Sequence, residues 1–147
     1  MSMAGEGDIR FDTRLSGVFR TPSVAPVRAA EGVLEVLRVP LGGVAARDAL
    51  FERFRESLGF PDWFGANWDA LEDCLDDFSW RDDRSRLLVI DGWEAFANAA
   101  PEDFATLLEI LRASGEFWAG QSRGFFVAMI DPHGVLDVPD LGLALHP

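Results

Sequence analysis

Carboxylate side chains gather in one short segment of this 147-residue chain. Residues 59–80, GFPDWFGANWDALEDCLDDFSW, contain no basic residue, and large aromatic side chains are spaced among the acidic ones. The acidic residues are Asp62, Asp69, Glu72, Asp73, Asp76 and Asp77. Carboxylates at this density attract a basic partner or bind a hard cation such as Mg²⁺. The segment is therefore the first candidate for a binding site.

The spacing within the segment predicts a helix that starts after an Asn67 N-cap and ends near Asp77. The positions at i, i+3 and i+7 that should face the core are Trp68, Leu71 and Leu75, with Cys74 beside them. The acidic positions at i, i+4 and i+7 on a different face are Asp69, Asp73 and Asp76. Like charges at this spacing repel one another. Local helix stability alone would not select this arrangement.

The loop before this helix combines bulky aromatics with an acidic residue. Trp63 and Phe64 follow Asp62 and precede Gly65, a composition typical of interface anchors. Two plainer interpretations stay open. The acidic face could be ordinary solvated surface of an acidic protein, and Trp63 or Phe64 could fold inward over the core.

The overall charge limits the class of partner. The formal net charge is -12, from 25 acidic and 13 basic residues, and all the basic residues are Arg. Direct binding to nucleic acid is disfavoured because that affinity comes from cations that displace counterions. The lone Cys74 excludes an internal disulfide and favours a reducing compartment. No signal-peptide pattern and no membrane-length apolar run is found, so we expect a cytoplasmic protein that does not bind membranes.

Strand and helix patterns alternate along the chain. Apolar runs predict strands at 33–39, 87–91 and 125–130, whereas amphipathic spacing predicts helices at 45–58 and 101–117 and a helical turn at 93–99. Alternation of this kind favours parallel pairing. We expect an α/β domain over residues 33–131, with a small three-stranded parallel sheet covered by helices. Residues 1–32 are an N-terminal extension of undetermined structure, and residues 132–147 an irregular tail.

The run PDWFGANWDALEDCL resembles the inhibitory segment of the barstar family of intracellular ribonuclease inhibitors. That segment has Pro, an acidic residue, two aromatics, Gly, any residue, Asn, an apolar residue, Asp-Ala-Leu and a second Asp. The matching positions here are Pro61, Asp62, Trp63, Phe64, Gly65, Asn67, Trp68, Asp69, Ala70, Leu71 and Asp73. The resemblance extends from residue 33 to about residue 131, and the predicted order of strands and helices is similar to the barstar fold.

The resemblance implies that the loop and helix block the active site of a small, basic, guanyl-specific ribonuclease, with carboxylates in the places of RNA phosphates. Asp73 would enter the phosphate-binding pocket, Asp69 would pair with an Arg of the enzyme, and Trp63 would pack against a catalytic side chain. Gly65 and Asn67 would shape the loop. The expected contact set is Trp63, Gly65, Asn67, Asp69, Glu72, Asp73, Asp76 and Asp77. Such an inhibitor is not an enzyme and needs no cofactor.

Two positions depart from the family pattern. Glu72 stands where the best-known member has an aromatic residue, and an interface Glu on the last helix corresponds to a position near Ala113. An immunity or regulatory module for a different basic toxin therefore stays open. A Mg²⁺-dependent enzyme using Asp69, Asp73 and Asp76 is a weaker alternative, because the sequence lacks a phosphate-cradling glycine loop, a Ser-centred elbow and His-rich metal spacing.

Overall fold

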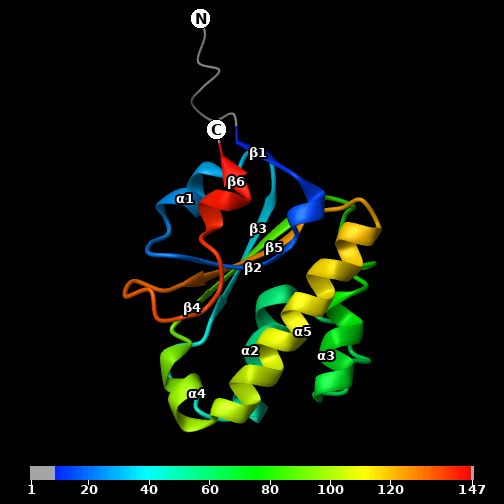
Figure 1. The fold of residues 1–147 in the computed structure, drawn as a ribbon. Helices are drawn as coiled ribbons and strands as arrows, with labels where there is room; N and C mark the ends of the chain where they lie inside the picture. Colours follow the sequence, from blue (N-terminus) through cyan, green and yellow to red (C-terminus); the bar gives the residue numbers. More distant parts are fainter. Residues whose placement is uncertain (1–8, 147) are drawn as a thin grey trace, which may run out of the picture.

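The chain folds around a four-stranded parallel sheet with the strand order β2-β5-β4-β3, in a computed structural model that describes residues 9–146 (Figure 1). The strands are β2 Gly17–Thr21, β3 Glu35–Pro40, β4 Arg86–Asp91 and β5 Phe125–Ile130. The expected parallel α/β fold is confirmed. The expected number of three strands is wrong, because β2, from the segment assigned no structure, pairs with residues 126–130 of β5.

The four helices that the sequence predicts occur in the expected order, and α1 is an additional helix in the N-terminal extension. They are α1 Ala25–Ala29, α2 Arg47–Leu58, α3 Trp68–Leu75, α4 Glu94–Ala99 and α5 Pro101–Gly120. Two short 3-10 helices, η1 Thr13–Leu15 and η2 Leu141–Leu143, lie near the ends of the described chain. There, β1 Arg10–Phe11 also pairs antiparallel with β6 Leu145–His146.

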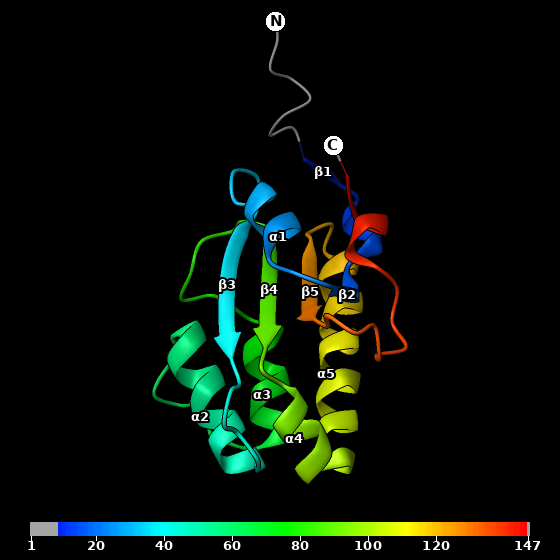
Figure 2. The same ribbon diagram turned by 90° about the vertical axis from the view of Figure 1, so that its left-hand side faces the viewer.

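Helices α2, α3, α4 and α5 cover one face of the sheet (Figure 2). Successive side chains of a strand point to opposite faces, and one alternate set, including Leu88 and Ile90 of β4, packs into this core. The apolar stripes of the helices supply the other half, with Phe54 of α2, Leu71 of α3 and Leu111 of α5 all buried. This larger core fixes α3, which carries the acidic segment.

A second core lies on the opposite face of the sheet. The other alternate set, including Leu87 and Phe126, packs there against Val27 of α1, Leu141 of η2 and Leu145 of β6. Helix α1 with Ala30, and residues 141–145, thus cover a sheet face that would otherwise be exposed to solvent. Covering both faces suits a parallel sheet, whose strands are apolar on each side.

A close approach of backbones joins β2 to the rest of the fold. Gly115 of α5 lies against Gly17, and a Cβ at position 115 would come within 2.8 Å of the Gly17 backbone. Only glycine therefore fits at this point of α5. Within residues 9–146, no helix has the length and apolar character that a membrane span requires.

Candidate partner-binding site

The loop between α2 and α3 is fixed at both ends by its backbone. Gly59 ends α2 in the left-handed conformation, with φ of 66°. This conformation favours glycine. Asn67 begins α3, and its side chain accepts a 2.8 Å hydrogen bond from the Ala70 N–H. The predicted N-cap is confirmed, and the aromatic loop has a defined path into the acidic helix.

The loop rests on a continuous layer of aromatic rings beneath it. Phe60 is buried and packs against Phe64 at 4.9 Å between ring centroids, and Phe64 in turn meets Phe51 of α2 at 6.4 Å. Trp63 points outward instead, with 57% of its surface exposed, and its ring meets that of Trp80 edge-on at 6.2 Å. Of the two loop aromatics, Phe64 packs against the core and Trp63 is presented to solvent.

Helix α3 buries one face and exposes another, much as its spacing predicts. Leu71, Cys74 and Leu75 are fully buried, whereas Trp68 is only half-buried against Phe51, with ring centroids 4.9 Å apart. The helix ends at Leu75, two residues before the expected end. The last turn of α3 contains no basic residue, and Asp76 and Asp77 follow it directly. Negative charges at a helix C-terminus are unfavourable, which is consistent with this early ending.

The acidic side chains differ in their environments. Asp69, Asp73 and Asp77 are exposed, whereas Glu72 and Asp76 are half-buried. Among the described residues, none of the carboxylates of this segment forms an ion pair. Asp69 and Asp73 are four residues apart and share a face of the helix, so two free carboxylates point the same way. Their negative charge is available to a cation from outside.

Asp76 lies where α3 meets α5. Its Oδ1 atom and the Ser114 hydroxyl are both buried and lack a hydrogen-bond partner among the described residues. Burial raises the pKa of Asp76 above its ordinary value of 3.8, and the charges of Glu72 and Asp73 raise it further. The Ser114 hydroxyl lies near enough to oppose this rise but does not reach hydrogen-bond geometry. The Asp76 carboxylate is therefore poorly satisfied in the free protein.

Two interactions that the sequence did not reveal hold the site in place. The first is a hydrogen bond of 2.8 Å that the indole N–H of Trp118 on α5 donates to the Leu75 carbonyl at the end of α3. This bond satisfies one of the carbonyls that a helix end leaves free. A tryptophan on the inner face of a helix gives no sequence signal for such a partner.

The second interaction is an ion-pair network that joins Glu35 of β3 to Arg81 and Arg86, which follow α3 in the chain. Arg86 is only 2% exposed and donates to Glu35 Oε1 at 2.7 Å, while Arg81 donates to Glu35 Oε2 at the same distance. The Arg86 guanidinium also stacks on the Phe78 ring, 4.6 Å from its centroid. Burial alone would raise the pKa of Glu35, but the two guanidinium groups together hold it below its ordinary value. The network joins residues 78–86 to β3.

The expected contact residues lie in the loop before α3, within α3 and in the two residues that follow it. These residues are Trp63, Gly65, Asn67, Asp69, Glu72, Asp73, Asp76 and Asp77. Half-burial sets Glu72 and Asp76 apart from the other carboxylates. Ala113 on α5 is exposed and carries no charge. Within residues 9–146, no cluster of three or more His, Cys, Asp or Glu side chains is positioned to hold a metal ion.

The fold and the site together define a helix-covered parallel α/β domain with exposed carboxylates on α3 and an exposed tryptophan in the preceding loop. The family model described as Barstar (barnase inhibitor) matches residues 34–130. The chain therefore belongs to the barstar family. A comparison with curated proteins gives no match. Strand β2, helix α1 and the segment after residue 130 lie outside the matched range.

Proposed function

We propose that this protein inhibits a small, basic, guanyl-specific ribonuclease by inserting the loop and α3 into its active site. The observation that carries this proposal is the pair of exposed carboxylates, Asp69 and Asp73, which have no ion-pair partner among the described residues. An RNA-binding enzyme holds cationic side chains where phosphates bind. The description of the matched family supports the same target class.

In this proposal each contact residue has a separate task. Asp73 takes the place of a phosphate, Asp69 pairs with an Arg of the enzyme, and Trp63 packs on a catalytic side chain. Gly65 and Asn67 hold the loop shape, a role that the Asn67 cap on α3 supports. Glu72, Asp76 and Asp77 extend the negative surface, which speeds encounter with a basic enzyme through long-range attraction.

A basic partner would also account for the unfavourable environment of the Asp76 carboxylate in the free protein. A half-buried carboxylate with a buried, unpaired oxygen is costly in the free protein. A cationic group of the partner near this carboxylate would favour its ionised form and lower its pKa toward the ordinary range. Contact residues of this kind trade stability of the free protein for affinity.

The test is an inhibition assay at low ionic strength. Purified protein is titrated into several basic guanyl-specific ribonucleases, including one encoded in the same genome, and cleavage of a fluorescent RNA substrate is followed. The proposal expects saturable inhibition of at least one enzyme, which weakens as salt screens the charges. If every enzyme retains full activity, the ribonuclease proposal is wrong.

A different basic toxin as the partner is the second candidate, and Glu72 favours it. A half-buried carboxylate at a position where the best-known family member has an aromatic residue changes the chemistry at the middle of the contact face. Capture of a basic protein without ribonuclease activity by the immobilised chain, together with no inhibition in the assay above, would support an immunity role against that toxin.

We also propose that the protein acts in the cytoplasm. Cys74 is the only cysteine and is fully buried. Burial, with smaller contributions from Asp77 and Asp73, raises its pKa to about 11. The thiol therefore stays protonated and unreactive, as suits a structural cysteine in a reducing compartment. Fractionation of cells that express the tagged chain tests this location.

A further inference from the structure

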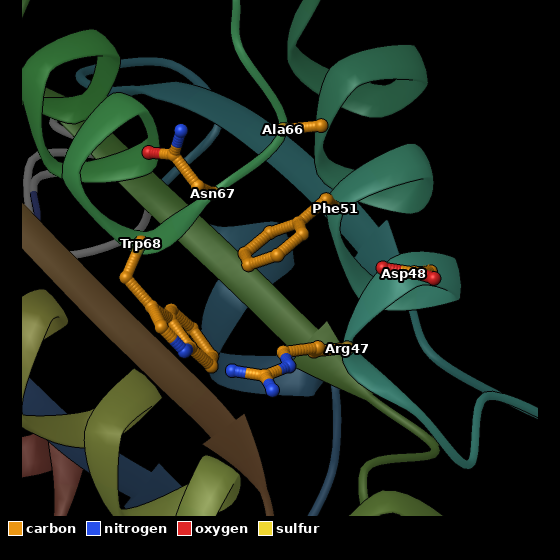
Figure 3. Close-up of a pocket in the computed structure, with 6 residues that line it drawn as sticks. All are labelled: Arg47, Asp48, Phe51, Ala66, Asn67 and Trp68. Carbon is orange, nitrogen blue, oxygen red and sulfur yellow. The ribbon is translucent and has the colours of Figure 1, made fainter.

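A hollow of about 200 Å³ opens between the first turn of α2 and the loop that leads into α3 (Figure 3). Its lining residues come from these two segments and the start of α3. They are Arg47, Asp48, Phe51, Ala66, Asn67 and Trp68. None of the predicted roles for the contact residues accounts for this hollow, although two of its lining residues lie immediately before Asp69.

The walls of the hollow are held in place before any partner arrives. Phe51 and Trp68 meet edge to face with centroids 4.9 Å apart, and Phe51 is buried in the main core. The Asn67 side chain is fixed by its capping bond to the Ala70 N–H. Ala66 has φ of 53°, so the loop turns sharply there and presents only a methyl group. A cavity whose walls are already ordered binds without paying for their ordering.

Charged side chains of both signs lie at the hollow. Arg47 and Asp48 are adjacent, exposed and opposite in sign. Arg47 also approaches Asp103 of α5, at 4.0 Å. Arg47 thus lies between two carboxylates, Asp48 on α2 and Asp103 on α5, while Phe51 and Trp68 line the hollow with aromatic carbon. An apolar group fits such a site best, because a charged group placed against the two aromatic rings would lose hydration.

We propose that this hollow receives one large apolar side chain of the basic partner, next to the cations that meet Asp69 and Asp73. The inference rests on the proposed function and adds to it a requirement on the partner's surface. That surface must carry a protruding aliphatic or aromatic side chain beside its cationic cleft. Apolar anchors that fill pockets beside charged contacts supply much of the binding energy at protein interfaces. The hollow would then select among basic enzymes whose cationic clefts are alike.

The test fills the hollow and leaves the carboxylates intact. Ala66→Leu adds bulk at the lining, and leucine is unbranched at Cβ, so it adds little strain beyond that of alanine at this φ. The matched control is Ala49→Leu, on the exposed surface of α2 and outside the lining. Binding of the full-length chain to a panel of basic guanyl-specific ribonucleases is measured by surface plasmon resonance.

The inference expects Ala66→Leu to weaken binding at least tenfold, mainly through faster dissociation, and Ala49→Leu to bind like the native chain. Asp48→Asn should change affinity less than threefold. Equal affinity of Ala66→Leu and the native chain would overturn the inference and leave the proposed function intact. A loss with Asp48→Asn as large as that with Ala66→Leu would also overturn it, because the occupant would then be a cation.

Failure of the inference and failure of the proposed function give different results. If the native chain binds none of the ribonucleases, both are wrong. If it binds one of them and Asp73→Ala weakens that complex, only the Ala66 comparison decides on the hollow. Thermal unfolding checks that each variant is folded, and Ala66→Met, with a more flexible side chain, replaces Ala66→Leu should that variant not fold.

Discussion

Removing the charge of Glu35 should destabilise the whole domain, because Glu35 on β3 forms ion pairs with Arg81 and Arg86. In the native fold Glu35 joins two guanidinium groups, and the more buried one, Arg86, has a side chain only 2% exposed. Glu35→Gln keeps the size of the side chain but removes its charge. Among the described residues, the Arg86 charge would then keep one carboxylate partner, Asp82, at 3.4 Å and with a side chain 54% exposed.

The magnitude follows from this geometry. Breaking a buried ion pair by removing one partner costs about 3–5 kcal/mol, because the remaining charge is uncompensated. Arg86 keeps hydrogen bonds to the carbonyl groups of Arg84 and Asp82 and its stacking on Phe78. The expected loss is therefore at the low end, about 3 kcal/mol. A loss of this size is a large fraction of the stability of an ordinary domain.

Urea denaturation at pH 7, followed by tryptophan fluorescence, measures this loss. The matched control is Glu52→Gln, which breaks the exposed pair with Arg55 on α2 and should leave the unfolding midpoint unchanged. Acid adds a second check. Because the folded pKa of Glu35 lies below the ordinary 4.5, its contribution is complete above pH 4.5 and is lost as the pH falls through the folded pKa. Similar midpoints for the two variants at pH 7 would refute the reasoning.

Three further predictions concern the layers around the site. Gly115→Ala should cost about 1–3 kcal/mol, because its Cβ would overlap the backbone of β2, whereas Gly120→Ala, with open space around it, should cost nothing measurable in the same urea titration. Leu141→Ala should cost about 2–5 kcal/mol in differential scanning calorimetry, because Leu141 is buried in the second core; an unchanged melting temperature would show that η2 does not cover the sheet. Asp76→Asn should stabilise the free protein at pH 7. The raised folded pKa of Asp76 makes its ionised form unfavourable, so the native penalty grows as the pH rises from 3.8 through the folded pKa, and the gain should vanish in melts below pH 3.8; an equal gain at both pH values would contradict the pKa argument.

The elements that the sequence predicted best are those with a local signal. The run at 125–130 gives β5 its bounds unchanged, and the apolar spacing at 101–117 predicts most of α5. The Asn67 cap and the buried face of α3 also follow from residue types at short spacing. Each of these features depends on periodicity or on a hydrogen bond within a few residues, so no distant partner was needed to find it.

The features that the sequence missed depend on distant partners. β2 is short and only partly apolar, and becomes a strand by pairing with β5, more than 100 positions later. Arg86 looks like the polar start of a strand, yet it is buried because Glu35 of the neighbouring strand neutralises it. The second core likewise joins the two ends of the described chain. Single-sequence patterns do not report such long-range pairing.

If α3 binds a basic ribonuclease through Asp69 and Asp73, as we propose, removing one of these carboxylates must weaken the complex. Isothermal titration calorimetry compares the native chain, Asp73→Ala and Asp137→Ala with a ribonuclease that the native chain inhibits. Asp137 is a suitable control because it is exposed and lies in the C-terminal segment, outside the proposed contact set. Asp82 would be a poor control because it accepts hydrogen bonds from Arg84 and Arg86.

The claim predicts that Asp73→Ala weakens the complex by at least about 2 kcal/mol, a general threshold for a hot-spot residue, for which a barstar complex is itself a standard example. Asp137→Ala should bind like the native chain, since charges outside an interface act mainly through weak long-range attraction. Equal affinities for the native chain and both variants would contradict the claim.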